Sequence, residues 1–363
     1  MKRRILFIGS MGEEYGGVTQ FAYNLCNSPL KDLYDFGFLN YYDVEERSHN
    51  IMVELKAETY QVSRYSVKPL SFMKEIRKFY HDHDNYDIIY CNASHASVIM
   101  YTMPLWFSRK AKLVFHSHAS DGNCKYLHKL FRIMVNWRCD LRIACSEHAA
   151  EWMYGKNKDV RVIYNGIDTA KFKYNLDTRK KIRAYYQIED AYVVGYFSRF
   201  TEGKNHLFLL DIFREIVRIK KNAILLLIGD GKCKNTIIEK LDEYHLSDKS
   251  IVLPSQEKIQ DYYNVLDLFI FPSKSEGFPL IGIEAQASGL PILMSDNITR
   301  SVACTSLAVY RSLKETAKEW AECAYNMGIN EDREKAWLLV KQAGFDKKEI
   351  AEKIISLLKT IGG

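Results

Sequence analysis

The chain has 363 residues, of which 47% are hydrophobic and 26% are charged. This length and composition indicate a soluble globular protein of two domains, and the net charge of +6 permits an anionic ligand or membrane surface without indicating nucleic acid. Eight scattered cysteines without a Cys-x-x-Cys pair, and apolar runs well short of about 20 residues, argue against a disulfide framework, a zinc site and a membrane-spanning helix.

The N-terminal half alternates short apolar strands with amphipathic helices. It opens with "MKRRILFIGS", whose apolar run is too short for an export signal, so we expect a cytoplasmic protein. The β-α-β order predicts a parallel sheet with helices on both faces. Strands are predicted over 4–9, 36–42, 60–65, 86–92, 111–119 and 139–146, and helices over 17–30, 71–83, 93–103 and 147–155.

A short strand and a turn in "VRVIYNGIDTAKF" (160–172) interrupt this order, which then begins again. Further strands are predicted over 191–200, 222–231, 250–255, 267–273 and 291–296, and helices over 205–220, 234–245, 259–266, 279–287 and 348–361. The sequence therefore predicts an α/β fold of two doubly wound, Rossmann-like domains that face each other across a cleft. We place the first domain at 1–165, the second at 166–345, and a C-terminal helix that packs back toward the first domain at 346–363.

The stretch "SEGFPLIGIEAQASGLP" (275–291) holds two glutamates in an otherwise apolar setting. Glu276 precedes the predicted helix over 279–287, and Glu284 lies within it. Because burial of an unpaired charge costs several kcal/mol, each carboxylate needs a partner. Ligands of open α/β sheets bind beyond the carboxyl ends of the strands, which is where this stretch begins.

Basic and glycine-rich loops follow other predicted strands at the same edge. Gly16 and Gly17, in "GEEYGGVTQF", would let the backbone approach a phosphate at a helix N-terminus, and a tight strand-to-helix turn is the alternative. Arg199 and Lys204, in "SRFTEGKN", would together neutralise a diphosphate, although each alone also fits a solvated loop charge.

Two histidines end the predicted strand over 111–119, in "FHSHAS". A metal site would need further ligands, so a single histidine that acts as acid, base or hydrogen-bond donor is the better functional interpretation, and a buried structural histidine is the alternative. The run "HDHDNYD" (81–87) looks like a metal cluster, but it falls between a helix and a strand, at the opposite end of the sheet. We interpret this run as a solvated loop.

The order of these motifs resembles the GT4 family of retaining glycosyltransferases, which have the GT-B fold. The series is Gly-Gly-Val in the first turn, a histidine after a mid-domain strand, "NGID", "SRFTEGKN", "IGDG" and the stretch over 275–291. The two glutamates match the family's E-x7-E motif. The resemblance extends from Gly16 to about residue 313, and "IEAQASGLPILMSDNIT" is similar to the branch found in bacterial exopolysaccharide and capsule clusters.

The resemblance implies a catalytic region made of His118, Arg199, Lys204 and Glu276. Arg199 and Lys204 would hold the diphosphate of the donor, and Glu276 would lie near the transferred sugar. His118 rather than His116 matches the family histidine when residues are counted from the strand "KLVFHSH".

The resemblance also implies the contacts to a nucleotide-sugar donor on the second domain. Glu284 would bind the ribose hydroxyls of the nucleotide. The other donor-binding positions that it implies are Gly16, Gly17, Ser198, Gly229, Gly277, Phe278, Pro279 and Leu280. Because GT-B enzymes need no metal for this chemistry, we expect no metal and no cofactor beyond the nucleotide-sugar, which is the co-substrate.

The activity implied is transfer of a sugar from a nucleotide-sugar, UDP being the most frequent nucleotide in the family, to a glycan or lipid-linked saccharide on the side of the first domain. Retention is expected, although no residue is an obvious covalent nucleophile. Basic and large apolar residues mix over 68–80, 103–112 and 126–138. They suit peripheral contact with the inner face of a membrane, and ordinary helices with snorkelling lysines are the alternative.

Two other classes of function stay open at this point. Doubly wound sheets bind dinucleotides, so a NAD-dependent oxidoreductase is one alternative, although no Gly-x-Gly-x-x-Gly follows the first strand. A non-catalytic partner protein with the same fold is the other. Within the transferases, a sugar-phosphate synthase is the nearest alternative.

Overall fold

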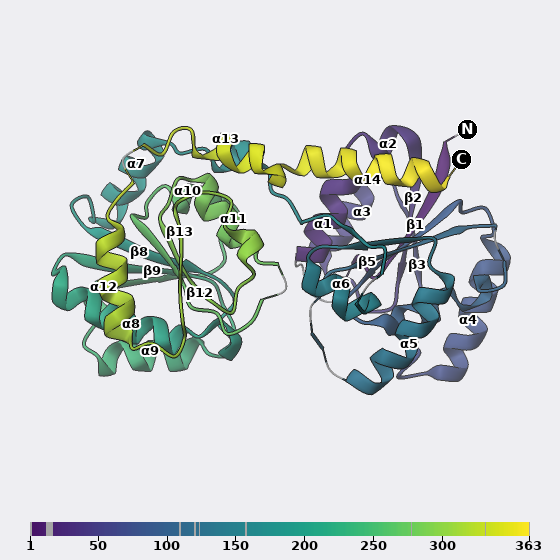
Figure 1. The fold of residues 1–363 in the computed structure, drawn as a ribbon, viewed down its shortest axis with the longest axis horizontal. Helices are drawn as coiled ribbons and strands as arrows, with labels where there is room; N and C mark the ends of the chain where they lie inside the picture. The colour runs from purple at the N-terminus through teal and green to yellow at the C-terminus, as the bar shows by residue number, and fades with distance from the viewer. Residues whose placement is uncertain are drawn as a thin grey trace. The chain divides into compact units, whose positions relative to one another are not determined.

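The computed structural model of this protein describes residues 2–11, 17–108, 110–119, 121–122, 124–156, 158–276, 278–330 and 332–362. The chain divides into two compact units. Met1–Gly166 and Lys347–Gly363 form the first unit, and Ile167–Asp346 forms the second. Each unit is a parallel sheet with helices on both sides (Figure 1).

The first unit is built on a seven-stranded parallel sheet in the order β3-β2-β1-β4-β5-β6-β7. Its central strands are buried on both faces by helices, which explains why they are continuously apolar rather than alternating. The strand order changes direction between β1 and β4, so the carboxyl ends of these two strands flank a switch point. The strands are β1 (Arg3–Ile8), β2 (Tyr34–Asn40), β3 (Glu58–Gln61), β4 (Ile88–Ala93), β5 (Lys112–Ser117), β6 (Leu141–Ala144) and β7 (Arg161–Val162).

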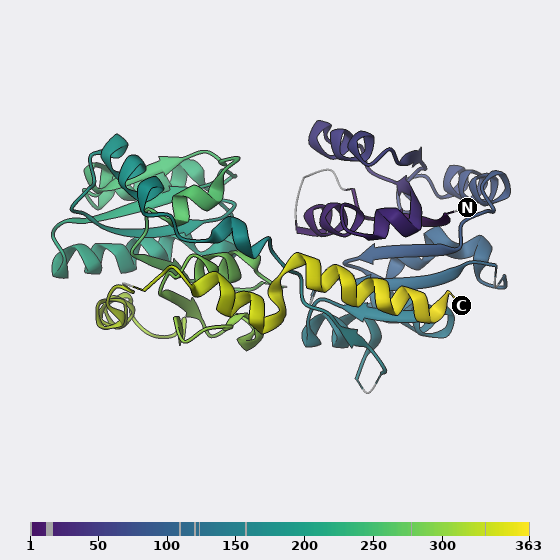
Figure 2. The ribbon, with the colours of Figure 1, turned by 90° about the horizontal axis from the view of Figure 1, so that it is seen from above.

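The helices of the first unit include one from the far end of the chain. This last helix, α14 (Lys347–Ile361), lies beside α1 (Gly17–Cys26) (Figure 2). Its Ile350, Ile354 and Leu358 join the same buried cluster as the apolar residues of α1 and β1. The remaining helices are α2 (Leu30–Leu33), α3 (Glu46–Glu54), α4 (Pro69–Asp82), the 3-10 helix η1 (Ala96–Leu105), α5 (Lys125–Arg138) and α6 (Glu147–Tyr154).

The second unit is built on a six-stranded parallel sheet in the order β10-β9-β8-β11-β12-β13. The strands are β8 (Tyr192–Phe197), β9 (Ala223–Ile228), β10 (Ser250–Leu253), β11 (Leu268–Phe271), β12 (Ile292–Ser295) and β13 (Ala308–Arg311). The chain leaves the sheet centre through β9 and β10 and returns to place β11 on the other side of β8. The switch point, where ligands of such sheets bind, therefore lies between β8 and β11.

The helices of the second unit carry an apolar stripe toward the sheet, as in α8, where Leu209, Leu210 and Phe213 are fully buried. The α-helices are α7 (Leu176–Tyr186), α8 (His206–Ile219), α9 (Lys234–Glu243), α10 (Ile259–Tyr263), α11 (Leu280–Ala287), α12 (Ala317–Met327) and α13 (Ala336–Val340). The shorter turns are η2 (Thr169–Phe172), η3 (Glu202–Lys204), η4 (Ser247–Lys249), η5 (Arg300–Val302) and η6 (Lys341–Phe345).

The two parallel sheets predicted from the sequence are confirmed, and several local predictions are wrong in detail. The helix expected over 17–30 is α1, which ends at Cys26. The strand expected over 60–65 is β3, which ends at Gln61. The helix expected over 93–103 is the 3-10 helix η1, which holds Pro104 in its last turn and therefore lacks one donor for regular α-helical bonding. The helix expected over 259–266 ends at Tyr263. The half-buried edge strand β13 was not predicted.

In the parts of the chain that the structure describes, no helix combines the length and the apolar character that crossing a bilayer requires.

Candidate active site

Lys204 and Glu276 form an ion pair at the switch point of the second sheet. Lys204 ends η3, which follows β8, and Glu276 follows β11. The Lys204 Nζ lies 2.6 Å from the Glu276 Oε1, and the two side chains are 21% and 11% exposed. The backbone N–H of Lys274 donates to the Gly203 carbonyl at 2.9 Å, which joins the two loops. A cation and a carboxylate thus meet where a ligand of this sheet would bind.

The loop after β8 also carries Ser198 and the exposed Arg199. The Ser198 hydroxyl lies 3.1 Å from His206 Nε2 at the start of α8, and the Ser198 N–H donates to the Ile228 carbonyl at 3.0 Å. Gly229 closes against this loop with φ of +154°, and a Cβ there would lie 1.9 Å from the Ser198 carbonyl oxygen. Only glycine fits at this position, so the structure requires Gly229 whether or not it also makes the expected contact to the donor.

Glu284 lies on α11, where its side chain is partly buried. The Tyr263 hydroxyl donates to the Glu284 Oε2 at 2.8 Å. Burial raises the pKa of Glu284 to about 7, and the hydrogen bond from Tyr263 acts in the opposite direction. The Tyr263 hydroxyl is therefore one hydrogen-bond partner of the Glu284 carboxylate within the protein.

The start of α11 presents backbone rather than side chains. Pro279 precedes the first helical residue, Leu280, and the Phe278 ring is buried and stacked on Phe345 with centroids 6.0 Å apart. The expected contacts of this segment to a sugar or phosphate would come from main-chain groups. Gly277, and Gly16 in the first unit, fall outside the described residues.

In the first unit, three polar side chains form a hydrogen-bonded chain at the carboxyl ends of β1, β4 and β5. Asn92 Nδ2 donates to the Ser10 hydroxyl at 2.7 Å, and His118 Nε2 lies 2.9 Å from Asn92 Oδ1. Because an amide oxygen only accepts, His118 carries its proton on Nε2 and its Nδ1 is left as an acceptor. This Nδ1 is buried and has no hydrogen-bond partner among the residues that the structure describes. Burial lowers the pKa of His118 to about 3, so the ring stays neutral.

The other histidine of the pair, His116, belongs to the core. Its side chain is fully buried on β5, and Tyr90 on β4 lies 2.9 Å from its Nδ1. Burial and the neighbouring His118 hold the pKa of His116 well below its usual value. The geometry therefore offers His118, and not His116, at the edge of the sheet. Gly17, the first residue of α1, is exposed, and a Cβ there would meet no atom within 4 Å.

A pocket of about 290 Å³ opens beside Asn92 at the same edge of the first sheet. Its walls are rich in aromatic rings, with Tyr41 stacked on Tyr101 at a centroid distance of 4.3 Å. Arg64 lies 4.3 Å over the ring of Tyr42. Among the described residues that line this pocket, none is acidic. The lining comprises Gly9, Val18, Tyr41, Tyr42, Arg64, Tyr65, Ser66, Asn92, Ala93, Ser94, His95, Ser97, Val98 and Tyr101.

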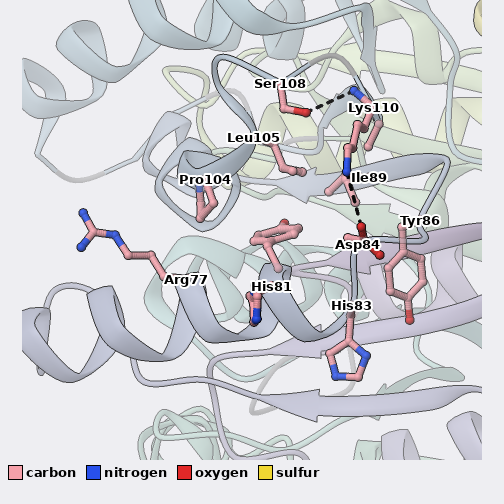
Figure 3. Close-up of a pocket in the computed structure, with 12 residues that line it drawn as sticks. Arg77, His81, His83, Asp84, Tyr86, Ile89, Pro104, Leu105, Ser108 and Lys110 are labelled. Atoms are coloured by element: carbon pink, nitrogen blue, oxygen red, sulfur yellow. Dashed lines mark hydrogen bonds and ion pairs between the residues drawn. The ribbon is translucent and has the colours of Figure 1, made fainter.

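The run "HDHDNYD" lines a different pocket, at the amino ends of β4 and β5 (Figure 3). His81, His83 and Asp84 project from the end of α4 and the loop after it, and Lys110 lies 3.4 Å from Asp84. Over the residues for which the structure gives a position, no three metal-ligating side chains gather in one place, this run included. The pocket lies at the opposite edge of the parallel sheet from His118.

Three residues of the candidate site, Ser10, Asn92 and Tyr263, were not predicted from the sequence. Asn92 ends a predicted strand, so its position at the carboxyl edge was a usable signal. Tyr263 gave no signal, because only the folded structure brings it next to Glu284, to which it donates a hydrogen bond. The packing partners of Tyr263 are Phe172, Phe197 and Phe269.

Known proteins resemble the chain in sequence. The putative glycosyltransferase EpsF of Bacillus subtilis is 27% identical over 334 residues, which cover 88% of this chain and 86% of EpsF. The capsular polysaccharide biosynthesis glycosyltransferase CapM of Staphylococcus aureus is 32% identical over 142 residues, or 38% of this chain and 36% of CapM.

Known structures resemble the chain in fold. HepE of Anabaena in complex with UDP has a TM-score of 0.81 at 19% identity, and the match covers 99% of this chain and 100% of HepE. HepE in complex with UDP-glucose has a TM-score of 0.78 at 18% identity, with 98% and 99% covered. Identity this low shows the fold alone.

Two family models match the two halves of the sequence. A model described as Glycosyltransferase Family 4 matches residues 15–171, and a model described as Glycosyl transferases group 1 matches residues 177–303. These matches set aside the oxidoreductase and the non-catalytic partner as functions. The chain belongs to the GT4 family of glycosyltransferases, with the two Rossmann-like domains of the GT-B fold.

Proposed function

We propose that this enzyme transfers a sugar from a UDP-sugar to a glycan or lipid-linked saccharide, with retention at the anomeric carbon, in exopolysaccharide or capsule assembly. The observation that carries the proposal is the Lys204–Glu276 pair at the switch point of the second sheet, next to the exposed Arg199. The binding of UDP and UDP-glucose by HepE supports the donor, and the role of CapM in capsular polysaccharide biosynthesis supports the pathway.

On the donor side, Arg199 and Lys204 neutralise the diphosphate that departs when the sugar–phosphate bond breaks. The ammonium of Lys204 is held by Glu276, so its position is fixed before the donor binds. Such preorganised charge is commonly the largest contribution to catalysis, and removal of one donor group costs about 10²–10³ in rate. These two cations supply the charge that a metal ion would otherwise supply, so we propose a metal-independent reaction.

Glu284 binds the ribose hydroxyls of the nucleotide through its carboxylate. The hydrogen bond from Tyr263 fixes the orientation of the carboxylate. Ribose hydroxyls donate more strongly to an ionised carboxylate than to a neutral one, since hydrogen bonds to charged groups are about twice as strong. Donor binding therefore favours the ionised form of Glu284.

In the first unit, His118 accepts a hydrogen bond from a substrate hydroxyl through Nδ1. The bond from Nε2 to Asn92 fixes the tautomer that this requires. The aromatic pocket beside Asn92 takes the acceptor saccharide: its tyrosine rings pack against sugar faces, and Ser94 and Ser97 on its walls offer hydroxyls to the sugar.

The proposal is tested by following UDP release and product anomer with a panel of UDP-sugars in EDTA. An α-linked product from an α-linked donor supports retention, and a β-linked product overturns it. Release of GDP or ADP from the corresponding donors, but not of UDP, would reassign the nucleotide.

A further inference from the structure

The first unit exposes a stripe of large apolar side chains on α5. We call it the α5 face: Phe107, Tyr126, Leu130, Ile133 and Trp137, which are 90%, 90%, 58%, 68% and 59% exposed. The four helical members are spaced by four, three and four residues, so they lie on one side of α5. Phe107 extends the stripe from the loop after η1, where its ring meets the edge of Trp137 with centroids 5.7 Å apart.

The opposite side of α5 is anchored, so the apolar side is held outward. His128 and Val135 are fully buried. His128 Nε2 lies 2.9 Å from the Trp152 carbonyl oxygen, and its Nδ1 accepts from the backbone N–H of Ala96 at 3.2 Å. A rotation of α5 that hid the stripe would break these bonds and expose Val135.

The last residue of α5 also fixes the loop that carries Phe107. Arg138 donates to the Leu105 carbonyl at 3.2 Å and to the Ser108 carbonyl at 2.8 Å. It forms an ion pair of 2.8 Å with Asp140 as well. Helix and loop therefore present the α5 face as one surface.

The segment around the α5 face is strongly basic. From Phe107 to Trp137 it contains six lysines and arginines and one acidic residue, Asp121. The net charge of this segment is therefore +5, compared with +6 for the whole chain. Asp121 pairs with Lys125 at 3.0 Å, and Lys129 is exposed on α5. The helix itself, over 125–138, contains no acidic residue.

We propose that the α5 face docks on an anionic lipid bilayer, with α5 lying in the plane of the interface. A helix with exposed aromatic and aliphatic side chains along one side and lysines at its edge binds in this way, by burial of apolar area and attraction to anionic headgroups. Tyrosine and tryptophan rings suit the interface because one end is apolar and the other polar.

The charge argues against a second copy of the chain as the occupant. An isologous dimer would place the same patch against itself and bring together two segments that each carry a net charge of +5, with Asp121 as the one acid in each. The docking is independent of the proposed reaction, because it places no residue of the α5 face in the donor or acceptor sites.

The test is co-sedimentation of the full chain with two kinds of vesicle. One is made of phosphatidylcholine alone, and the other contains roughly 30% of the anionic lipid phosphatidylglycerol. The result expected is binding to the anionic vesicles that weakens as salt is added, and little binding to phosphatidylcholine. Equal binding to both compositions, or binding to neither, overturns the proposal.

Two variants test which residues carry the binding. The double change Ile133→Ser with Trp137→Ser is expected to weaken vesicle binding by about tenfold or more, because it removes two apolar side chains from the membrane interface. The matched control, Tyr325→Ser with Ile329→Ser, removes side chains that are 55% and 52% exposed in the second unit, and should bind as the unchanged protein does. Equal loss in both variants overturns the assignment.

The charge is tested separately. Lys129→Glu is expected to lower affinity for anionic vesicles about tenfold, and Lys353→Glu, an exposed lysine on α14, is expected to have little effect. Sedimentation velocity without lipid gives the competing outcome. A dimer of the unchanged chain that Ile133→Ser with Trp137→Ser converts to a monomer would assign the α5 face to a second copy instead.

Discussion

Tyr263, which is fully buried, donates its phenolic hydrogen to the partly buried Glu284 carboxylate at 2.8 Å within the second unit. The pair joins α10 to α11, and its carboxylate has a pKa of about 7. A carboxylate that changes charge near neutral pH should make both stability and ligand binding depend on pH.

The stability of the ligand-free protein should fall as pH rises from about 4.5 to about 7, because of Glu284. Burial raises the pKa of Glu284 from 4.5 to about 7 in the folded state, so the folded protein holds a proton that the unfolded chain has released. Glu284→Gln should therefore be more stable than the unchanged protein at pH 8, by on the order of 2–3 kcal/mol, and equal near pH 4.5.

Urea unfolding at pH 4.5 and pH 8 measures this difference. Glu239→Gln, at an exposed position on α9, is the matched control and should show no pH-dependent gain. A Glu284→Gln variant that is less stable than the unchanged protein at pH 8 would show that the carboxylate is better stabilised than its burial indicates.

Affinity for a UDP-sugar should rise as pH increases through 7, by about tenfold in all, because the ribose hydroxyls donate to the ionised Glu284. A UDP-sugar is the right probe because its diphosphate does not titrate in this range. Calorimetric titrations at pH 6 and pH 8 give the two affinities. Glu284→Gln should bind more weakly and show no pH dependence, whereas a pH dependence that survives in this variant would have to come from another group.

Tyr263→Phe should keep the fold and weaken nucleotide binding. The ring still packs between Phe197 and Phe269, but the carboxylate loses its orienting donor. We expect a loss of affinity of about fivefold to tenfold, from one hydrogen bond to a charged group. Tyr310→Phe, which removes a comparable bond to the Thr299 carbonyl in the same unit, should leave affinity unchanged. Equal effects would indicate general loosening of the unit.

Much of the fold follows from the sequence because buried parallel strands are continuously apolar and the helices repeat their apolar residues at helical spacing. An element is missed where tertiary structure, rather than the local sequence pattern, determines it. One example is the strand β13, whose residues AVYR are only half-buried at the edge of the sheet. The same limit applies to the site. Lys204 and Glu276 were each noticed in a loop, but their pairing depends on the adjacency of β8 and β11.

The tautomer of His118 should depend on Asn92. In the unchanged protein, Nε2 carries the proton because it donates to Asn92 Oδ1. Asn92→Ala removes that acceptor and should lower kcat by about tenfold with little change in UDP affinity. A misplaced histidine in the catalytic region weakens stabilisation of the transition state but does not weaken binding of the donor. Nitrogen NMR of the imidazole reports the tautomer directly. If Asn92→Ala keeps the normal tautomer of His118 but has a lower kcat, Asn92 does not position His118 and is only a structural residue of the acceptor pocket.

Lys204 is proposed to hold the diphosphate of a uridine nucleotide, and calorimetric titration of UDP with EDTA present tests this role most directly. Lys234→Ala is the matched control, since Lys234 also pairs with a carboxylate in the second unit, that of Asp230 at 3.1 Å. If Lys204 has this role, UDP binds the unchanged protein and Lys234→Ala alike, and Lys204→Ala binds UDP at least tenfold more weakly. Equal binding by all three proteins, or no binding by the unchanged protein, would contradict it.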